Sequence, residues 1–329
     1  MDHGGLGLGT YLGGPGAEVD DGYLAAGRAF LEAGGSVFDT AANYRGGRSE
    51  RVLGRLLAGL ERDGFFISTK AGYLPMSDGR TAEDPRTWFR RVLEGPGVLS
   101  AEDVVDGCHA LTPAYLRHQL GTSLEALGLA RVDLFHLHNP EQQRPLRGPK
   151  AFRAVLRSAF EACEGLRAEG RISEYGCATW NGLRVPPEAA DHLSVEELLR
   201  LAEEAGGRHH GFRWLQLPLN LAMPEAFLAP TQRFGGTLMT VLEAARAAGL
   251  RVQTSASMMQ ARILRQLQPE VMATLGGATP AQAALQFPRS CPGVEVALCG
   301  MASLAHVQEN APVMGLPKVD PDALRRLYC

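Results

Sequence analysis

The chain alternates short apolar segments with amphipathic helical patterns, and this alternation restricts its possible folds more than any other feature. Eight apolar segments, most of them roughly four to eight residues long, are bounded by Gly, Pro or Asn, as buried parallel strands are. They span residues 5–11, 36–40, 65–70, 132–138, 172–179, 214–220, 250–255 and 294–299. Amphipathic patterns lie between them at residues 23–33, 51–60, 115–127, 152–169, 195–205, 238–248 and 280–287.

Strict alternation of eight strands with helices predicts a closed (β/α)8 TIM barrel, and we expect residues 1–329 to form this one domain. The competing architecture is an open doubly wound sheet, which carries a Gly-rich turn and a helix directly after its first strand. Residues 5–9 read GLGLG, but no helical pattern starts there. The sequence therefore favours the barrel.

Two connections, residues 73–113 and 221–237, are too long to be simple turns, and both follow predicted strands. In a barrel, the loops after strands overhang the C-terminal face, where active sites lie. The first connection contains Trp88 and Phe89. We predict that it forms an ordered lid over the barrel mouth and that Trp88 or Phe89 contacts the substrate or the cofactor. The alternative is that they only dock the lid.

Composition excludes several classes of function. The net charge is −3, which gives no reason to expect binding to nucleic acid or to an anionic membrane. No apolar run reaches the roughly 18 residues of a membrane span, and the N-terminal residues do not resemble a secretory signal. The six cysteines form no CxxC pair, so neither a disulfide framework nor a zinc ribbon is expected. We therefore expect a cytoplasmic protein.

Four polar residues lie at or just after the C-terminal ends of predicted strands: Asp39, Tyr44, Lys70 and His138. Each has an ordinary structural explanation when it is taken alone, such as a helix cap or a solvated lysine. Together they indicate a site, because the C-terminal ends of barrel strands face the substrate.

The chemistry of these four residues suits proton transfer to a carbonyl group. A phenol with a pKa of about 10 is a poor proton donor at neutral pH unless its surroundings change that value. A nearby ammonium group is expected to lower the pKa of Tyr44, and Asp39 would hold Lys70 charged and in place. His138 would bind the reacting oxygen and share in the proton transfer.

His136 and His138 lie on the same face of one predicted strand, which is how metallohydrolase barrels present two metal ligands. Such a site needs further ligands, and Asp39 is the only clear one at a strand end. The metallohydrolase is therefore the least favoured function. We expect no metal and interpret His136 as a deeper barrel residue with internal hydrogen bonds.

Several motifs resemble those of the aldo-keto reductases. They are FDTAANYRGGRSERVLG, ISTKAG, LGTSLEALGLARVDLFHLHNP, LQLPLN and ALCGMASLAHVQEN, and they occur in the family's order. The resemblance implies a (β/α)8 barrel that uses NADP(H), or less often NAD(H), without metal. It implies that Asp39, Tyr44, Lys70 and His138 form a catalytic tetrad. Hydride would pass from the nicotinamide to a carbonyl carbon while Tyr44 protonates the oxygen.

The resemblance also implies a set of binding residues. The cofactor would contact Thr10, Tyr11, Asp39, Thr179, Gln216, Ser255, Gly300, Ser303, Glu309 and Asn310, and the substrate would contact Tyr11 together with Trp88 and Phe89. The chain departs from the family's pattern at three places: Ala178-Thr179 replace Ser-Asn, Ser255 replaces an aromatic residue, and no Arg or Lys lies between residues 300 and 310. Arg289, just before the last strand, is the candidate to replace the missing cation from the side. We expect a weakened preference for NADP(H).

The leading functional prediction is an NAD(P)H-dependent reductase of an aldehyde, a ketone or a sugar-like substrate. The departures at the cofactor positions support a second hypothesis, a nucleotide-binding regulatory or sensor barrel without turnover. The sequence specifies neither the substrate nor the oligomeric state.

Overall fold

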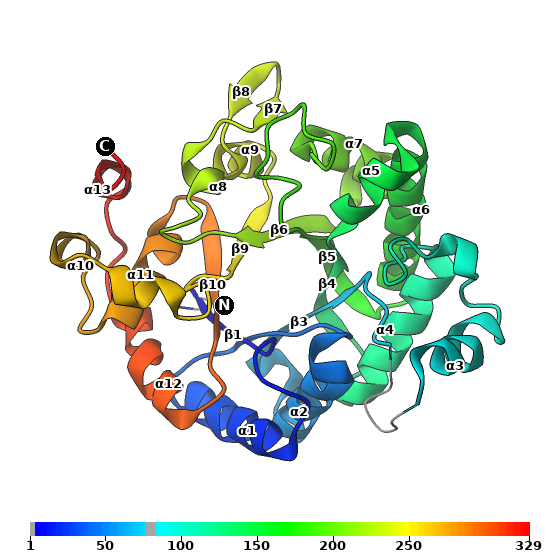
Figure 1. Ribbon diagram of the computed structural model, residues 1–329, viewed down its shortest axis with the longest axis horizontal. Coiled ribbons are helices and arrows are strands. Elements are labelled where there is room, and N and C mark those ends of the chain that lie inside the picture. The colour runs from blue at the N-terminus through cyan, green and yellow to red at the C-terminus, as the bar shows by residue number, and fades with distance from the viewer. Residues whose placement is uncertain (1–3, 77–82) are drawn as a thin grey trace.

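The computed structural model describes residues 4–76 and 83–329, which form a closed barrel of eight parallel strands. The strand order around the barrel is β1-β10-β9-β6-β5-β4-β3-β2, so the first strand pairs with the last (Figure 1). The barrel strands are β1 (Leu6–Gly9), β2 (Val37–Asp39), β3 (Phe66–Ala71), β4 (Val132–His138), β5 (Ile172–Ala178), β6 (Phe212–Pro218), β9 (Arg251–Ser255) and β10 (Val294–Gly300). The predicted (β/α)8 TIM barrel is confirmed.

Helices surround the barrel. The longer ones are α1 (Ala17–Glu32), α2 (Arg48–Leu57), α4 (Pro113–Leu127), α6 (Pro149–Ala168), α7 (Val195–Gly206), α9 (Val241–Ala247), α11 (Pro280–Ser290) and α12 (Leu304–Asn310). Shorter helices are α3 (Pro85–Phe89), α5 (Arg144–Arg147), α8 (Glu225–Leu228), α10 (Pro269–Leu275) and α13 (Pro321–Arg326). Their ends follow local chemistry. Thr112 caps α4 with Pro113 in its first turn, and Gly128 ends it in a left-handed conformation with φ 66°.

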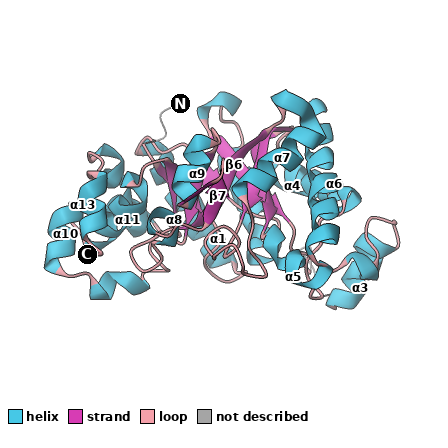
Figure 2. Ribbon diagram, turned by 90° about the horizontal axis from the view of Figure 1, so that it is seen from above, coloured by secondary structure: helices cyan, strands magenta, loops and turns pink. Residues whose placement is uncertain are grey.

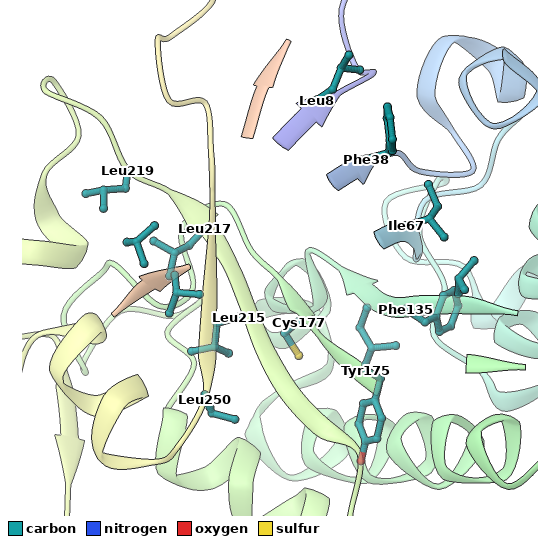
Figure 3. Close-up of a cluster of buried hydrophobic side chains, with 14 of the residues drawn as sticks. Leu8, Phe38, Ile67, Phe135, Tyr175, Cys177, Leu215, Leu217, Leu219 and Leu250 are labelled. Atoms are coloured by element: carbon teal, nitrogen blue, oxygen red, sulfur yellow. The ribbon is translucent and has the colours of Figure 1, made fainter. Parts of the chain in front are cut away.

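The main core lies between the outer face of the barrel and the helices. Strand alternation sends Leu8, Phe38, Ile67 and Phe135 outward into this core (Figure 3). The same alternation turns Asp39, Lys70 and His138 into the barrel. Because successive side chains of a strand point to opposite faces, the same strands supply both the apolar outer face and the polar interior of the barrel.

The bottom of the barrel is filled by a second apolar cluster, in which Val37, Val296 and Leu298 meet. Gly7 lies among these side chains, and a Cβ atom at this position would come within 2.8 Å of Leu298. The close approach explains why the first strand carries a glycine there. The barrel is thus closed by packing below its polar layer.

The second long connection has more structure than the sequence indicated. It contains α8 and an antiparallel hairpin of β7 (Gln232–Phe234) and β8 (Thr237–Met239). The predicted helix at 238–248 is therefore wrong at its start, because Leu238 lies in β8 and the helix begins at Val241. Thr240 and Glu243 form a capping box that fixes this start.

Part of the first long connection lies far from the barrel axis. Its helix α3 lies at the outer edge of the molecule in both views (Figures 1 and 2). Trp88 is only 3% exposed and packs in a cluster of the connection's own apolar residues, with Phe89 partly buried against it. This packing corrects the expectation that Trp88 or Phe89 contacts the substrate or the cofactor, and it matches the docking alternative for the two aromatic residues. Residues 77–82 of the predicted lid lie outside the described residues.

No helix in the described part of the chain is both long and apolar enough to cross a membrane.

Candidate active site

Asp39, at the end of β2, is the centre of a buried hydrogen-bond network inside the barrel. Its Oδ2 accepts a hydrogen bond from Lys70 Nζ at 2.6 Å. Its Oδ1 accepts from Ser68 Oγ at 2.7 Å and from Gln216 Nε2 at 2.9 Å. Lys70 Nζ also donates to the carbonyl oxygen of Thr40 at 2.8 Å. The predicted Asp39–Lys70 pair is therefore formed, and both side chains are held in place.

Tyr44 lies directly above this pair. Lys70 Nζ is 4.8 Å from the centroid of the Tyr44 ring, and the His138 ring lies 5.8 Å from it, edge to face. Burial raises the pKa of Tyr44 well above its usual value, and the negative charge of Asp39 adds to the rise. We expected Lys70 to lower this pKa, but the pKa is raised instead, and the main cause is desolvation of the phenol. Tyr44 is therefore a protonated phenol at neutral pH.

His138 completes the group at the end of β4. Burial lowers the pKa of its imidazole well below the usual value, and the charge of Lys70 lowers it further. Its Nδ1 is buried and has no hydrogen-bond partner among the described residues. The Tyr73 ring packs edge-on against the His138 ring at 5.0 Å. A neutral imidazole next to a protonated phenol can hold an oxygen atom through hydrogen bonds.

A pocket of about 640 Å³ opens over these residues. Its lining includes nearly all the predicted binding residues: Thr10, Tyr11, Asp39, Thr179, Gln216, Ser255, Gly300, Glu309 and Asn310. Tyr44 and His138 line it too, whereas Lys70 lies beneath. The loops after β9 and β10 form one end, and the loops after β1, β2, β3, β4 and β5 form the other.

Three sequence predictions do not match the pocket. Ser303 is not among its described lining residues; its hydroxyl caps α12 by accepting from the amide of His306. Trp88 and Phe89 are also absent from this lining. Arg289 donates hydrogen bonds to the carbonyl oxygens of Gly4, Met314 and Leu316, so its guanidinium is held away from the cofactor loops.

His136 lies one layer below His138, where it is fully buried. Its Nε2 is 3.4 Å from Gln253 Oε1, as expected for an internally bonded barrel residue. Gln253 also accepts a hydrogen bond from Gln216. Within residues 4–76 and 83–329, no group of three or more His, Cys, Asp or Glu side chains is placed to hold a metal ion.

A family model described as "Aldo/keto reductase family" matches residues 5–195, which is more than half of the chain. The chain belongs to the aldo/keto reductase family.

Curated relatives of this aldo/keto reductase include D-threo-aldose 1-dehydrogenase from Pseudomonas sp., which is 34% identical over 159 residues. That alignment covers 48% of this chain and 44% of the relative. Aflatoxin B1 aldehyde reductase member 2 from Mus musculus is 31% identical, with 46% of this chain and 31% of the relative covered. The matched segment is thus less than half the length of either relative. A longer match, at 23% identity over 90% of this chain and 80% of the relative, is a putative voltage-gated potassium channel subunit beta from Schizosaccharomyces pombe.

Solved structures share the fold of this aldo/keto reductase across nearly its whole length. One is an aldo/keto reductase from Klebsiella pneumoniae in complex with NADP and acetate, with a TM-score of 0.66 and 24% identity. It covers 98% of this chain and 91% of that one. An aldo-keto reductase from Bacillus halodurans in its holo form gives a TM-score of 0.64 at 18% identity. That match covers 98% of this chain and 91% of the other.

Sequence reasoning missed several pocket residues of this aldo/keto reductase. Tyr73, Asn139 and Trp180 all line the pocket, and Asn139 Nδ2 donates to the Tyr73 hydroxyl at 3.1 Å. Each lies one or two residues beyond the end of a barrel strand, where a search of all strand ends would have found it. Glu141 holds the loop with Trp180: its Oε1 accepts from the amides of residues 180, 181 and 182.

His109 joins the first long connection to the active site. Its Nε2 lies 2.7 Å from the carbonyl oxygen of His138, which can only accept, so Nε2 carries the proton. Its Nδ1 lies 3.0 Å from Gln143 Nε2. Arg147 donates to Gln143 Oε1 at 2.7 Å and thereby fixes the orientation of the amide, so the Gln143 amide donates to Nδ1. A second proton, on Nδ1 of His109, would point at the Gln143 amide, which is itself a donor, so the neutral imidazole is favoured.

Acid is therefore expected to destabilise the protein through His109. Burial lowers the pKa of its imidazole to about 4 from its usual 6.5. The stabilisation of the folded state by neutral His109 is complete above pH 6.5 and is lost as the pH falls toward 4. The reason is that His109 takes up a proton at a higher pH in the unfolded chain than in the folded protein. We expect the free energy of unfolding to fall by on the order of 1–3 kcal/mol over this range. Urea unfolding at several pH values measures it, and His109→Gln should give a shallower dependence. Equal slopes in both proteins would contradict the prediction.

Proposed function

We propose that this aldo/keto reductase family member is an NAD(P)H-dependent oxidoreductase that reduces the carbonyl group of a small molecule. The observation that carries the proposal is a group of four side chains at the base of a pocket large enough for a ligand: buried Asp39 and Lys70, with half-buried Tyr44 and His138. We treat residues 1–329 as one domain, because this group and the cofactor loops come from opposite ends of the chain.

Each residue of the group has a distinct task in the proposed reaction. His138 and Tyr44 bind the carbonyl oxygen of the substrate, which polarises the carbonyl bond. A nicotinamide cofactor, when bound, would supply the hydride for the carbonyl carbon. Tyr44 then gives its phenolic proton to the oxygen, and Lys70 stabilises the phenolate that remains. Asp39 keeps Lys70 charged and oriented throughout.

The pocket residues suit a dinucleotide. The Gln216 amide reaches the pocket base, and the loops after β9 and β10 contribute Ser255, Gly300 and Asn310 to its other end. Buried Asn310 Oδ1 has no hydrogen-bond partner among the described residues, and an adenine amino group would satisfy it. NADP bound to the Klebsiella pneumoniae relative supports the same class of cofactor here.

The substrate end of the pocket is aromatic and uncharged. Tyr11, Tyr73 and Trp180 line it together with Asn43 and Asn139, and no Arg or Lys is among the described lining residues. A neutral aldehyde, ketone or sugar-like compound fits such walls better than a carboxylate or phosphate does, because a buried anion needs a positive partner. The names of the Pseudomonas and mouse relatives, an aldose dehydrogenase and an aldehyde reductase, support this substrate class.

A regulatory barrel that binds nucleotide without turnover is the second candidate. The similarity to the putative potassium channel subunit beta favours it, because that alignment covers 90% of this chain. The two functions differ in turnover, not in cofactor binding. Fluorescence titration with NADPH, followed by NADPH oxidation with a panel of neutral aldehydes, separates them. Binding with turnover supports the reductase, binding alone supports the regulatory barrel, and no binding contradicts both.

We further expect only a weak preference for NADPH over NADH. A 2′-phosphate normally meets an Arg or Lys, and the described pocket lining offers His306 and the acidic Glu309 instead. Replacing a charged partner with a neutral one forfeits on the order of 1–2 kcal/mol, or about tenfold in affinity. The measurement is a pair of dissociation constants at one ionic strength.

His306→Arg tests where the phosphate lies. We choose this position because His306 lines the pocket, whereas Ser303 does not. The variant should raise the NADPH preference by about tenfold, and His306→Gln, which adds no charge, should leave it unchanged. A wild-type preference of roughly a thousandfold or more would mean that another cation holds the phosphate.

A further inference from the structure

Arg45, the residue after Tyr44, has an unusual backbone conformation. Its φ is 52° and its ψ is 36°, and Gly46 and Gly47 follow with φ values of 62° and 77°. Left-handed backbone suits glycine, whereas a residue with a long side chain is strained in it. Such strain persists only where surrounding contacts enforce it, and it concentrates at functional sites. The contacts of the Arg45 side chain therefore need an explanation.

The Arg45 guanidinium is buried, with its side chain 1% exposed, and it joins two parts of the molecule. Its Nη2 donates to Asp20 Oδ1 of α1 at 2.5 Å. Its Nε donates to the carbonyl oxygen of Gly14 at 3.0 Å, and its Nη2 to that of Gly16 at 3.2 Å. It also lies over the ring of Tyr23, 5.3 Å from the centroid. One side chain thus ties the Tyr44 turn to α1 and to the loop before it.

That loop, residues 11–16, forms part of the pocket wall. Tyr11 and Leu12 line the pocket, and the Tyr11 ring packs edge-on against the Tyr44 ring at 5.1 Å. The rest of the loop reads GGPG and is exposed to solvent, and Tyr11 itself is 59% exposed. A Gly-rich, exposed segment has little packing of its own to fix it. The two carbonyl groups held by Arg45 anchor its far end, and the Tyr23 hydroxyl holds the Leu12 carbonyl at 2.9 Å.

We propose that Arg45 is a positioning residue: paired with Asp20, it holds the loop of residues 11–16 against Tyr44 and so sets the wall that receives the substrate. The inference rests on the proposed function, because substrate binding is one of its measures. A glycine would occupy position 45 without strain but could hold neither carbonyl. Arg45 is strained at a position next to the proposed proton donor, and its guanidinium is needed there to anchor the loop.

Arg45→Gly tests the proposal, because it relieves the backbone strain and removes the guanidinium that holds the carbonyl groups of residues 14 and 16. We expect amide hydrogen exchange to speed up at least about tenfold in residues 11–16. We expect KM for a neutral aldehyde such as 4-nitrobenzaldehyde to rise about tenfold, while kcat stays within about threefold of wild type. Arg45→Lys should restore the exchange rate and KM only in part. One ammonium group cannot reach Asp20 and the carbonyl oxygens of residues 14 and 16 together.

Arg48→Gln is the matched control. Arg48 also pairs with Asp20. The loop carbonyls of residues 14 and 16 accept from Arg45 instead. This variant removes the same kind of ion pair from the same carboxylate and should leave exchange in residues 11–16 near the wild-type rate. Asp20→Asn keeps the two loop bonds of Arg45 but removes their charged anchor, so it should give an intermediate exchange rate. It serves as the second variant if Arg45→Gly does not fold.

Unchanged exchange and unchanged KM in Arg45→Gly would overturn the proposal, as would Arg48→Gln with an effect equal to that of Arg45→Gly. Hydrogen exchange needs no activity. If the wild type reduces no carbonyl, the proposed function fails while the exchange measurement still decides whether Arg45 anchors the loop.

Discussion

Tyr44→Phe is expected to lower kcat for carbonyl reduction by roughly 10²–10⁴-fold, because it removes the proton that the proposed reaction gives to the substrate oxygen. The phenol is the group best placed for this transfer. It lines the base of the pocket, its raised pKa keeps it protonated, and Lys70 Nζ lies 4.8 Å from its ring centroid, where the ammonium group stabilises the negative charge that develops on the phenol. The ring itself remains, so packing against His138 and Tyr11 should persist. Initial rates with saturating NADPH measure the effect.

Tyr11→Phe is the matched control for this experiment. It removes the hydroxyl group of the neighbouring Tyr11 ring, which packs against Tyr44 but is largely exposed. We expect it to retain most of the wild-type kcat, and we expect both variants to bind NADPH and to melt near the wild-type temperature. Wild-type turnover in Tyr44→Phe would remove Tyr44 from the mechanism.

Lys70→Met should abolish activity and also destabilise the fold by about 3–5 kcal/mol, because it leaves a buried carboxylate without its positive partner. The Lys70 side chain is fully buried, and its ammonium group contacts Asp39 at 2.6 Å. Ser68 and Gln216 would still donate to Asp39, but neither carries charge. Chemical denaturation and steady-state kinetics give the two readouts.

The double variant Asp39→Asn/Lys70→Met separates stability from catalysis. It removes both charges, so much of the lost stability should return, while activity should not. A double variant as unstable as Lys70→Met would show that the charge of Asp39 is not the source of the damage. An active Lys70→Met would show that the lysine is not needed for the phenol to act.

The sequence supplied most of the barrel because strand patterns and helix patterns are local. All eight barrel strands fall within or next to the predicted segments, since each is a short apolar run with a clear end. Asp39, Lys70 and His138 could be found for the same reason: each is a polar residue at a strand terminus. The start of α9 could not, because the residues before Thr240 pair across a hairpin that only the tertiary structure reveals.

The features that were missed depend on packing that appears only once the chain is folded. Trp88 was expected in the pocket because its segment is long and aromatic, but it is buried in a local cluster instead. The pKa of Tyr44 was expected to fall because of Lys70, but the extent of its burial, which raises it, is a property of the assembled site. His109 gave no signal in the sequence, since its partners lie 29 and 34 residues away.

The pairing of β1 with β10 has a consequence for how the protein reaches its active form. Leu6 is in register with Ala297, so the two strands that close the barrel are nearly the whole chain apart. Such distant pairing forms late during folding, after the intervening units are in place. On the ribosome, the first strand must therefore wait for its neighbour until residues 294–300 have been synthesised. The pocket has Thr10 on one side of this seam and Gly300 on the other, so cofactor binding would report that the last strand has been synthesised and inserted.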